Sequence, residues 1–180
     1  ALERSVGKEE SPIGKEILTD IVKNAEIAAR DGVAICQDTG FAVFFVELGQ
    51  EVAVVGGDFN AAINEGVRLG YKEGYLRKSI VDDPFYRRKN TSDNTPAIIH
   101  TFIVPGDRIK ITMAPKGGGS ENMSAVAMLK PAQGVEGVID FVLRTADAAG
   151  PNPCPPMVIG VGIGGTMDKA AQPAKFALMR

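Results

Sequence analysis

The chain has two cysteines, and the residues next to the first could combine thiolate chemistry with acid–base chemistry. Cys36 is followed directly by Gln37 and Asp38, and Cys154 lies in the proline-rich segment 150–156. Thiolates are preferred ligands of soft metal centres, and a neighbouring carboxylate can exchange protons with a substrate bound there. The two cysteine segments together therefore predict a metal-dependent enzyme.

Each cysteine also has a simpler interpretation. Cys36 could be a buried thiol that enters a strand, followed by an Asp-Thr-Gly turn, and Cys154 could be a small apolar residue in a connector. The prolines around Cys154 restrict its backbone and would fix a loop. The cysteines are 118 positions apart and do not form a disulfide framework, although a single bridge stays open.

Glycine-rich segments follow two of the predicted strands. In the segment 116–122, Lys-Gly-Gly-Gly-Ser-Glu-Asn, backbone N–H groups can converge on an anion, with Lys116 and Ser120 as further donors. It lacks the spacing of a nucleotide triphosphate loop, and a flexible turn is the alternative. The segment 160–166 does not have the G-x-G-x-x-G spacing, so it predicts close backbone packing near a site, with anion binding at a helix terminus as a lesser option.

Two further side chains could serve a site. Arg77 follows a predicted helix and precedes Lys78-Ser79, and its guanidinium group could hold a carboxylate of a dicarboxylate substrate. His100, the only histidine, lies on a predicted strand. A residue that supports the core or the site is expected there rather than a catalytic base.

Length and composition favour one compact domain without nucleic-acid or membrane partners. The chain has 180 residues, 44% of them hydrophobic, with a net charge of −2. No block of basic residues gives a footprint for nucleic acid or an anionic membrane. The first residues lack the apolar core of a secretory signal, so we expect a cytoplasmic protein.

Four helices are expected from hydrophobic spacing and from their end signals. Ser11 and Pro12 begin a helix that runs to about Arg30. Asp58 caps a second helix to about Glu73, residues 134–149 form a third, and Thr166 starts the last.

The strands are expected to form antiparallel pairs. Residues 41–48 and 52–55 predict one hairpin, residues 97–104 and 108–113 predict a second across Pro-Gly-Asp, and 157–161 predicts a short buried strand. Strand pairs with flanking helices indicate an α+β fold, which could be divided into two lobes.

Six segments in this order resemble one family. The resemblance is to the class I, iron-sulfur fumarate hydratases and L(+)-tartrate dehydratases, in the α-subunit or N-terminal part, and it extends from the first helix to Arg180. The segments that carry it are Ile35–Gly40, Arg77–Ser79, Asn94–Ala97, Lys116–Asn122, Gly150–Pro156 and Gly160–Thr166.

The resemblance implies a [4Fe-4S] cluster held by three cysteines, with one iron open to the substrate. Cys36 and Cys154 match two ligands, whereas the third is expected beyond position 180. Asp38 is implied to be catalytic. The positions implied to bind substrate are Gln37, Asp38, Arg77, Gly118, Gly119, Ser120, Glu121 and Asn122.

The expected function is reversible hydration of fumarate to (S)-malate, as in the tricarboxylic acid cycle, ahead of tartrate dehydration. Residues 1–180 would be a partial catalytic domain without the base, the histidine and the substrate clamp, which the family takes from a β subunit or C-terminal domain. The isolated fragment is therefore expected to be inactive, and oligomerisation is expected. A non-catalytic anion-binding scaffold is the alternative.

Overall fold

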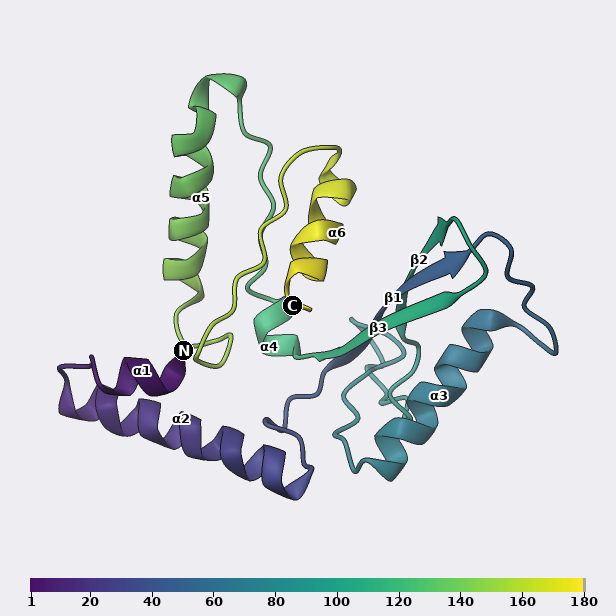
Figure 1. Ribbon diagram of the computed structural model, residues 1–180, viewed down its shortest axis with the longest axis horizontal. Helices are drawn as coiled ribbons and strands as arrows, with labels where there is room; N and C mark the ends of the chain where they lie inside the picture. Colours follow the sequence, from purple (N-terminus) through teal and green to yellow (C-terminus); the bar gives the residue numbers. More distant parts are fainter. Residues whose placement is uncertain (180) are drawn as a thin grey trace. The chain divides into compact units, whose positions relative to one another are not determined.

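The computed structural model describes residues 1–179 and divides the chain into two compact units, residues 1–37 and the part that begins at Asp38 (Figure 1). Helices accompany a small mixed sheet, so the expected α+β class is confirmed. No helix within residues 1–179 is long and apolar enough to cross a membrane.

The first unit consists of two helices, α1 (Leu2–Val6) and α2 (Pro12–Asp31), and the segment after them. The Ser11 hydroxyl accepts a hydrogen bond from the Gly14 amide, and Pro12 is the first helical residue, as the sequence predicts. Gly32 ends α2 with φ +63°, a conformation that glycine adopts without strain.

The second unit contains a three-stranded sheet in the order β2-β1-β3. β1 (Phe41–Gly49) is central, and it pairs in parallel with β2 (Ile98–Val104) and antiparallel with β3 (Ile109–Lys116) (Figure 1). Both predicted hairpins are therefore wrong. Residues 52–55 form no strand, and β2 and β3 do not pair with each other.

The reason for the different pairing lies in β1 itself. Its residues Ala42, Val43, Phe45 and Val46 are all buried, so both faces of β1 lie in the core, which is usual for a strand at the centre of a sheet. The end of β1 also enters the Pro-Gly-Asp turn, where the Gly49 amide donates to the Arg108 carbonyl and the Gln50 amide donates to the Val104 carbonyl. This turn therefore connects β2 and β3 across the end of β1, which lies between them, and no two-stranded hairpin forms.

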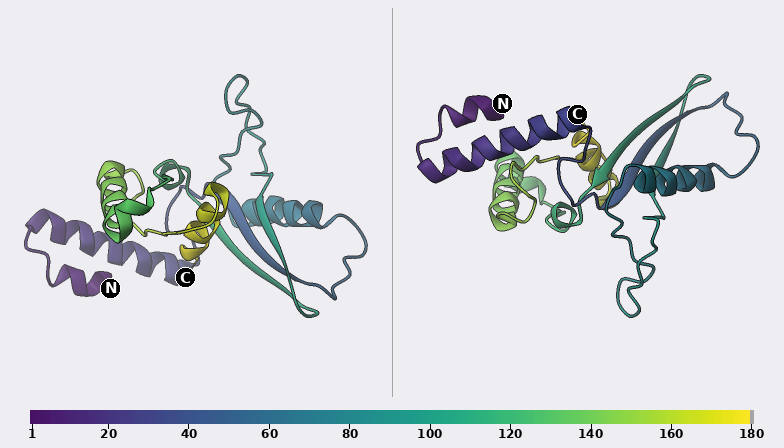
Figure 2. Two further views of the ribbon diagram at one scale, coloured as in Figure 1. Left: turned by 90° about the horizontal axis from the view of Figure 1, so that it is seen from above. Right: turned by 90° about the horizontal axis from the view of Figure 1, so that it is seen from below.

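Helix α3 (Phe59–Glu73) covers one face of the sheet (Figure 2). Asp58 caps it by accepting a hydrogen bond from the Ala61 amide, as predicted. Val67 and Tyr71 pack with Ala42 of β1 in the core of the unit. On the other face, Phe45 stacks on His100 at 4.9 Å and meets Phe176 edge-on at 5.1 Å between ring centroids.

The remaining elements are α4 (Gly118–Glu121), a short 3₁₀ turn (Pro131–Gln133), α5 (Gly134–Ala149) and α6 (Met167–Ala177). The predicted strand 157–161 is wrong, because these residues are irregular and Val158 is 73% exposed. The prediction of close packing at 160–166 is confirmed. A Cβ added to Gly160 would lie 2.0 Å from the Ala174 carbonyl oxygen, so this backbone lies directly against α6.

Candidate functional site

Asp38 lies where two other predicted site segments meet in the second unit. The Gly119 amide donates a hydrogen bond to Asp38 Oδ2 at 3.3 Å. Nη2 of Arg77 lies 3.8 Å from Asp38 Oδ1. Asp38, Arg77 and the glycine-rich segment, separated by up to 81 positions, therefore form one cluster, which we call the Asp38 site.

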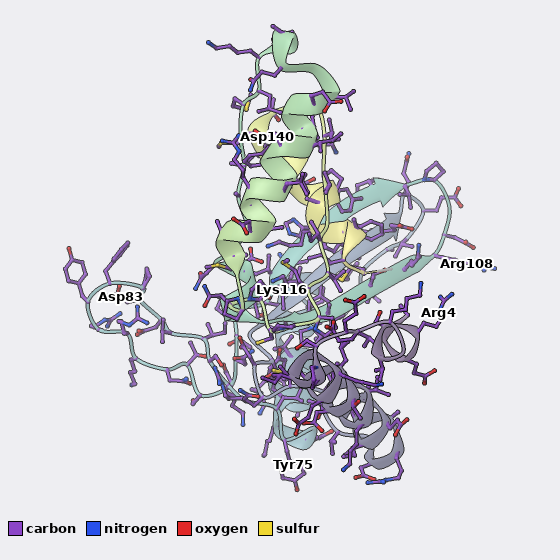
Figure 3. All side chains as sticks on the ribbon, turned by 90° about the vertical axis from the view of Figure 1, so that its left-hand side faces the viewer. Arg4, Tyr75, Asp83, Arg108, Lys116 and Asp140 are labelled. Atoms are coloured by element: carbon purple, nitrogen blue, oxygen red, sulfur yellow. The ribbon has the colours of Figure 1, made fainter. Side chains whose placement is uncertain are left out.

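The antiparallel pairing of β1 with β3 brings these segments together. Phe41, the first residue of β1, lies opposite Lys116, the last residue of β3. Asp38 precedes β1 and the glycines follow β3, so both segments come to the same end of the sheet. Figure 3 marks Lys116 at this point, where β3 leads into α4.

Three hydrogen bonds, two of them buried and one partly buried, fix the backbone next to Asp38. Tyr71 Oη donates to the Thr39 carbonyl at 2.8 Å, and Thr39 Oγ1 donates to the Arg77 carbonyl at 2.9 Å. Asn94 Nδ2 donates to the Gly40 carbonyl at 2.8 Å. Burial raises the pKa of Tyr71, which keeps this hydroxyl protonated as a donor. The roles of Thr39 and Tyr71 could not be predicted from the sequence, because no local pattern marks a tertiary hydrogen bond.

Asn94 joins the Asp38 segment to the Arg77 segment. Its side chain is fully buried, and Oδ1 accepts hydrogen bonds from the amides of Ser79 at 2.7 Å and Ile80 at 3.3 Å. Replacing Asn94 by Ala is expected to lower the free energy of unfolding by about 2–4 kcal/mol, because buried backbone groups lose their partners. Urea denaturation of the purified protein measures this change.

Asn60 provides the matched control for Asn94. It is exposed near the start of α3, and Asn60→Ala is expected to change the free energy of unfolding by less than about 0.5 kcal/mol. Equal effects of the two substitutions would contradict the role assigned to Asn94.

The side chains at the end of the glycine-rich segment contact two lysines. Lys116 Nζ donates to Ser120 Oγ at 2.6 Å and lies 3.5 Å from Glu121 Oε2, while Lys175 Nζ of α6 lies 2.6 Å from Glu121 Oε1. Burial lowers the pKa of Lys116, and the charge of Lys175 lowers it further against the opposing effect of Glu121. Lys175 could not be predicted from the sequence as a site residue, because its partner is 54 positions away.

The Glu121 carboxylate is ionised in this environment. Burial alone would raise its pKa, but the hydrogen bond from Lys175 and the charges of both lysines outweigh burial and hold the pKa below its usual range. The contacts of His100 do not indicate a catalytic base. Burial and the charge of Lys175 lower its pKa, and its ring stacks on Phe45. These contacts agree with the supporting role expected for His100.

Cys154 lies in a loop that also contacts the glycine-rich segment. The loop passes so close that a Cβ on Gly119 would be 3.0 Å from the Asn152 carbonyl oxygen. Asn152 Nδ2 lies 3.5 Å from the sulfur atom of Met123, just beyond α4. Cys154 itself is an exposed thiol with φ +62°. Gly119 therefore has the Asp38 carboxylate and the Cys154 loop as neighbours.

Cys36 and Gln37 belong to the first unit. The Cys36 thiol is partly exposed and donates to Gln37 Oε1 at 3.5 Å. Asn24 of α2 donates to the Ile35 carbonyl at 2.8 Å, which attaches this segment to the helix. Within residues 1–179, no three His, Cys, Asp or Glu side chains are grouped so that they could hold a metal ion. The roles assigned to Cys36 and Gln37 stay predictions.

Comparison with known proteins extends over the whole chain. The family model described as "Fumarate hydratase (Fumerase)" matches residues 1–180. "Putative L(+)-tartrate dehydratase subunit alpha" of Methanocaldococcus jannaschii is 44% identical over 100% of this chain and 65% of its own length. "L(+)-tartrate dehydratase subunit alpha" of Escherichia coli K12 is 30% identical over 96% of this chain and 57% of its own length.

The chain thus spans about 57–65% of the length of these relatives. The family that the six sequence segments resemble is the family that the model matches from end to end. This chain belongs to the fumarate hydratase (Fumerase) family.

Proposed function

We propose that the chain is the α-type part of an iron–sulfur hydro-lyase that reversibly hydrates fumarate to (S)-malate. The observation that carries this proposal is the position of Gly119, which has the Asp38 carboxylate on one side and the Cys154 loop on the other. The carboxylate proposed to transfer protons and the loop that carries a proposed thiolate ligand therefore both contact one short backbone segment. The relatives are named as α subunits, so we further propose a β-subunit partner and an oligomeric assembly. A cytoplasmic location is part of the proposal as well.

The chain has side chains of the type that bind an iron–sulfur cluster. Cys36 and Cys154 are thiols, and both are at least partly accessible. We assign them as two ligands of a [4Fe-4S] cluster, with a third cysteine from outside residues 1–180. When bound, such a cluster supplies an open iron that acts as a Lewis acid on a substrate hydroxyl and carboxylate.

The chain's own residues would bind the diacid and transfer a proton. Asp38 is proposed to exchange a proton with the substrate hydroxyl that leaves as water. The Gly119 amide and Arg77 would hold the Asp38 carboxylate in place. Arg77 is 56% exposed at its side chain, so it can also bind a substrate carboxylate. Gln37 and the amide of Gly118 would contribute further donors, while Gly119 takes part in the site through its bond to Asp38.

The last residues of the glycine-rich segment are assigned to the same site. The Ser120 and Glu121 side chains contact lysines, so their proposed contribution is to hold the shape of the segment, while Asn122 is exposed and can reach a ligand. Arg77 pairs with Asp38, and Lys116 and Lys175 pair with Glu121, so cations outnumber carboxylates by one around this segment. A positive site favours binding of an anion, with Arg77 as the proposed direct contact.

Dehydration of L(+)-tartrate is the second candidate reaction. It is favoured by the curated relatives, since a protein named for this activity matches the entire chain at 44% identity. Fumarate hydration and tartrate dehydration both add or remove water next to a carboxylate, so the same residues could serve either reaction. Parallel assays with fumarate, (S)-malate and L(+)-tartrate separate the two.

The test uses the full-length chain expressed with its β partner and reconstituted with iron and sulfide without oxygen. We expect about four irons for each α chain, as a [4Fe-4S] cluster requires, a broad brown absorbance band and hydration of fumarate. A colourless assembly without iron would favour the anion-binding scaffold. An assembly that binds its cluster but acts on no hydroxy-dicarboxylate would refute the proposed substrate class.

Replacing Arg77 by Gln is expected to raise the KM for the diacid about 10–100-fold, because a charged hydrogen bond to carboxylate is worth about 1.5–3 kcal/mol. Steady-state kinetics with fumarate measure this effect. The Thr39 contact uses the Arg77 carbonyl and survives the change. Arg87→Gln, on an exposed side chain in the loop around Asp83, is the matched control and should leave KM unchanged.

A further inference from the structure

Helix α6 reaches the Asp38 site through one ion pair. Lys175 Nζ lies 2.6 Å from Glu121 Oε1, and the side chains are 25% and 30% exposed. Glu121 ends α4, the single turn whose residue Gly119 donates to Asp38. A side chain 54 positions away therefore holds the far end of the segment that contacts the proposed catalytic carboxylate.

Lys116 is a second, more distant cation for Glu121, at 3.5 Å from Oε2, and it is shared with Ser120. Its ammonium group already donates to Ser120 Oγ at 2.6 Å, and Ser120 Oγ donates to the Gly117 carbonyl at 3.1 Å. Glu121 Oε2, which faces Lys116, is buried and accepts no hydrogen bond among the described residues. Removal of Lys175 would leave a half-buried carboxylate with one shared cation, which is unfavourable.

Helix α6 is itself fixed to the rest of the second unit. Its backbone lies against Gly160 and Gly162, where an added Cβ would come within 2.0 and 2.1 Å of helix carbonyl oxygens. Phe176, next to Lys175, packs edge-on against Phe45 of β1. Lys175 therefore projects from a support that is rigid relative to the sheet and can hold Glu121 in one place.

We propose that Lys175 is a positioning residue of this hydro-lyase. By holding Glu121 it keeps the turn of residues 117–121 in the geometry that directs the Gly119 amide at Asp38. The catalytic part of this inference rests on the proposed function, whereas the effect on the turn does not.

The test compares Lys175→Met, Lys175→Arg and Lys169→Met in the full-length chain assembled with its β partner. Lys169 is an exposed lysine on the same helix and serves as the matched control. Hydrogen–deuterium exchange of residues 117–122, measured by mass spectrometry, reports the turn directly. In Lys175→Met we expect these amides to exchange about tenfold faster, because the turn opens locally more often.

Turnover provides the second readout. Lys175→Met is expected to lower kcat about tenfold, with KM within about threefold of normal and iron content unchanged, because a misdirected Asp38 affects the reacting state. Lys175→Arg should keep both the amide exchange and kcat close to normal, since it keeps the cation. Lys169→Met should change neither.

The outcomes separate the inference about Lys175 from the proposed function. Unchanged exchange in Lys175→Met would overturn the inference whatever the activity. Faster exchange with normal kcat would also overturn it, since the turn would then not matter for catalysis. An unsubstituted enzyme that contains its cluster but acts on no diacid would refute the proposed function, while exchange would still decide whether Lys175 holds the turn.

Discussion

Replacing Asp38 by Asn is expected to lower kcat by about 10²–10⁴-fold, the usual contribution of a positioned acid–base group. Asn has nearly the same shape, and its Oδ1 can still accept the hydrogen bond that the Gly119 amide donates at 3.3 Å. The substitution therefore removes the exchangeable proton and the charge but keeps the contact. Steady-state rates of fumarate hydration by the assembled, cluster-containing enzyme measure the loss.

The same preparations must be compared for iron content and stability. Asp38→Asn should keep its iron and its unfolding temperature, so that turnover falls far more than cluster loading. Asp107→Asn, on a carboxylate that is 78% exposed in the turn after β2, is the matched control and should leave all three quantities unchanged. Equal loss of iron and turnover in Asp38→Asn would show that Asp38 is structural.

The helices of the second unit and the Asp38 site could be predicted to different extents. Local signals marked the start of α3 well, since a cap such as Asp58 bonds to an amide three residues away, whereas the short helix α4 was not predicted. Strand pairing could not be predicted in this way. The turn after Val104 is consistent with a hairpin, yet the end of β1 bonds to both of its sides. Pairing depends on contacts between segments far apart in the sequence, a property of the whole core.

The site shows the same limit. Asp38, Arg77 and the glycines could be selected because their residue types suit a diacid, and the structure brings these three together. Lys175 carried no such mark, because a lysine on an amphipathic helix is usually solvated surface. Only the tertiary packing of α6 gives it a partner among the site residues. Local patterns thus predict the groups proposed to act, while the residues that hold them in place depend on the fold.

Replacing Gly40 by Ala is expected to have the largest effect on folding. Gly40 has φ +40°, and a Cβ here would lie 2.0 Å from the Lys116 carbonyl oxygen and 2.8 Å from the Gly117 Cα. Both are backbone atoms, so no side-chain rotation relieves the clash. Overpacking costs about 1–3 kcal/mol or more, and the left-handed conformation adds about 1–2 kcal/mol. A domain with a stability of about 5–15 kcal/mol would lose much of it.

Two other glycines separate the clash from the backbone strain. Gly56 has φ +87° but nothing within 4 Å of an added Cβ, so Gly56→Ala should cost only about 1–2 kcal/mol for its conformation. Gly66 lies inside α3 with equally open space, and Gly66→Ala should stabilise the protein by about 0.5–1 kcal/mol. Urea denaturation ranks the three variants.

The ranking also tests how the site is assembled. Gly40 is the point where the Asp38 segment passes against the end of β3, so its missing side chain permits the contact between Asp38 and the glycine-rich turn. If Gly40→Ala proved no less stable than Gly56→Ala, the two segments would not be in close contact. Asp38 would then have to be positioned by some other part of the chain, and the assignment of Gly119 as its donor would fail.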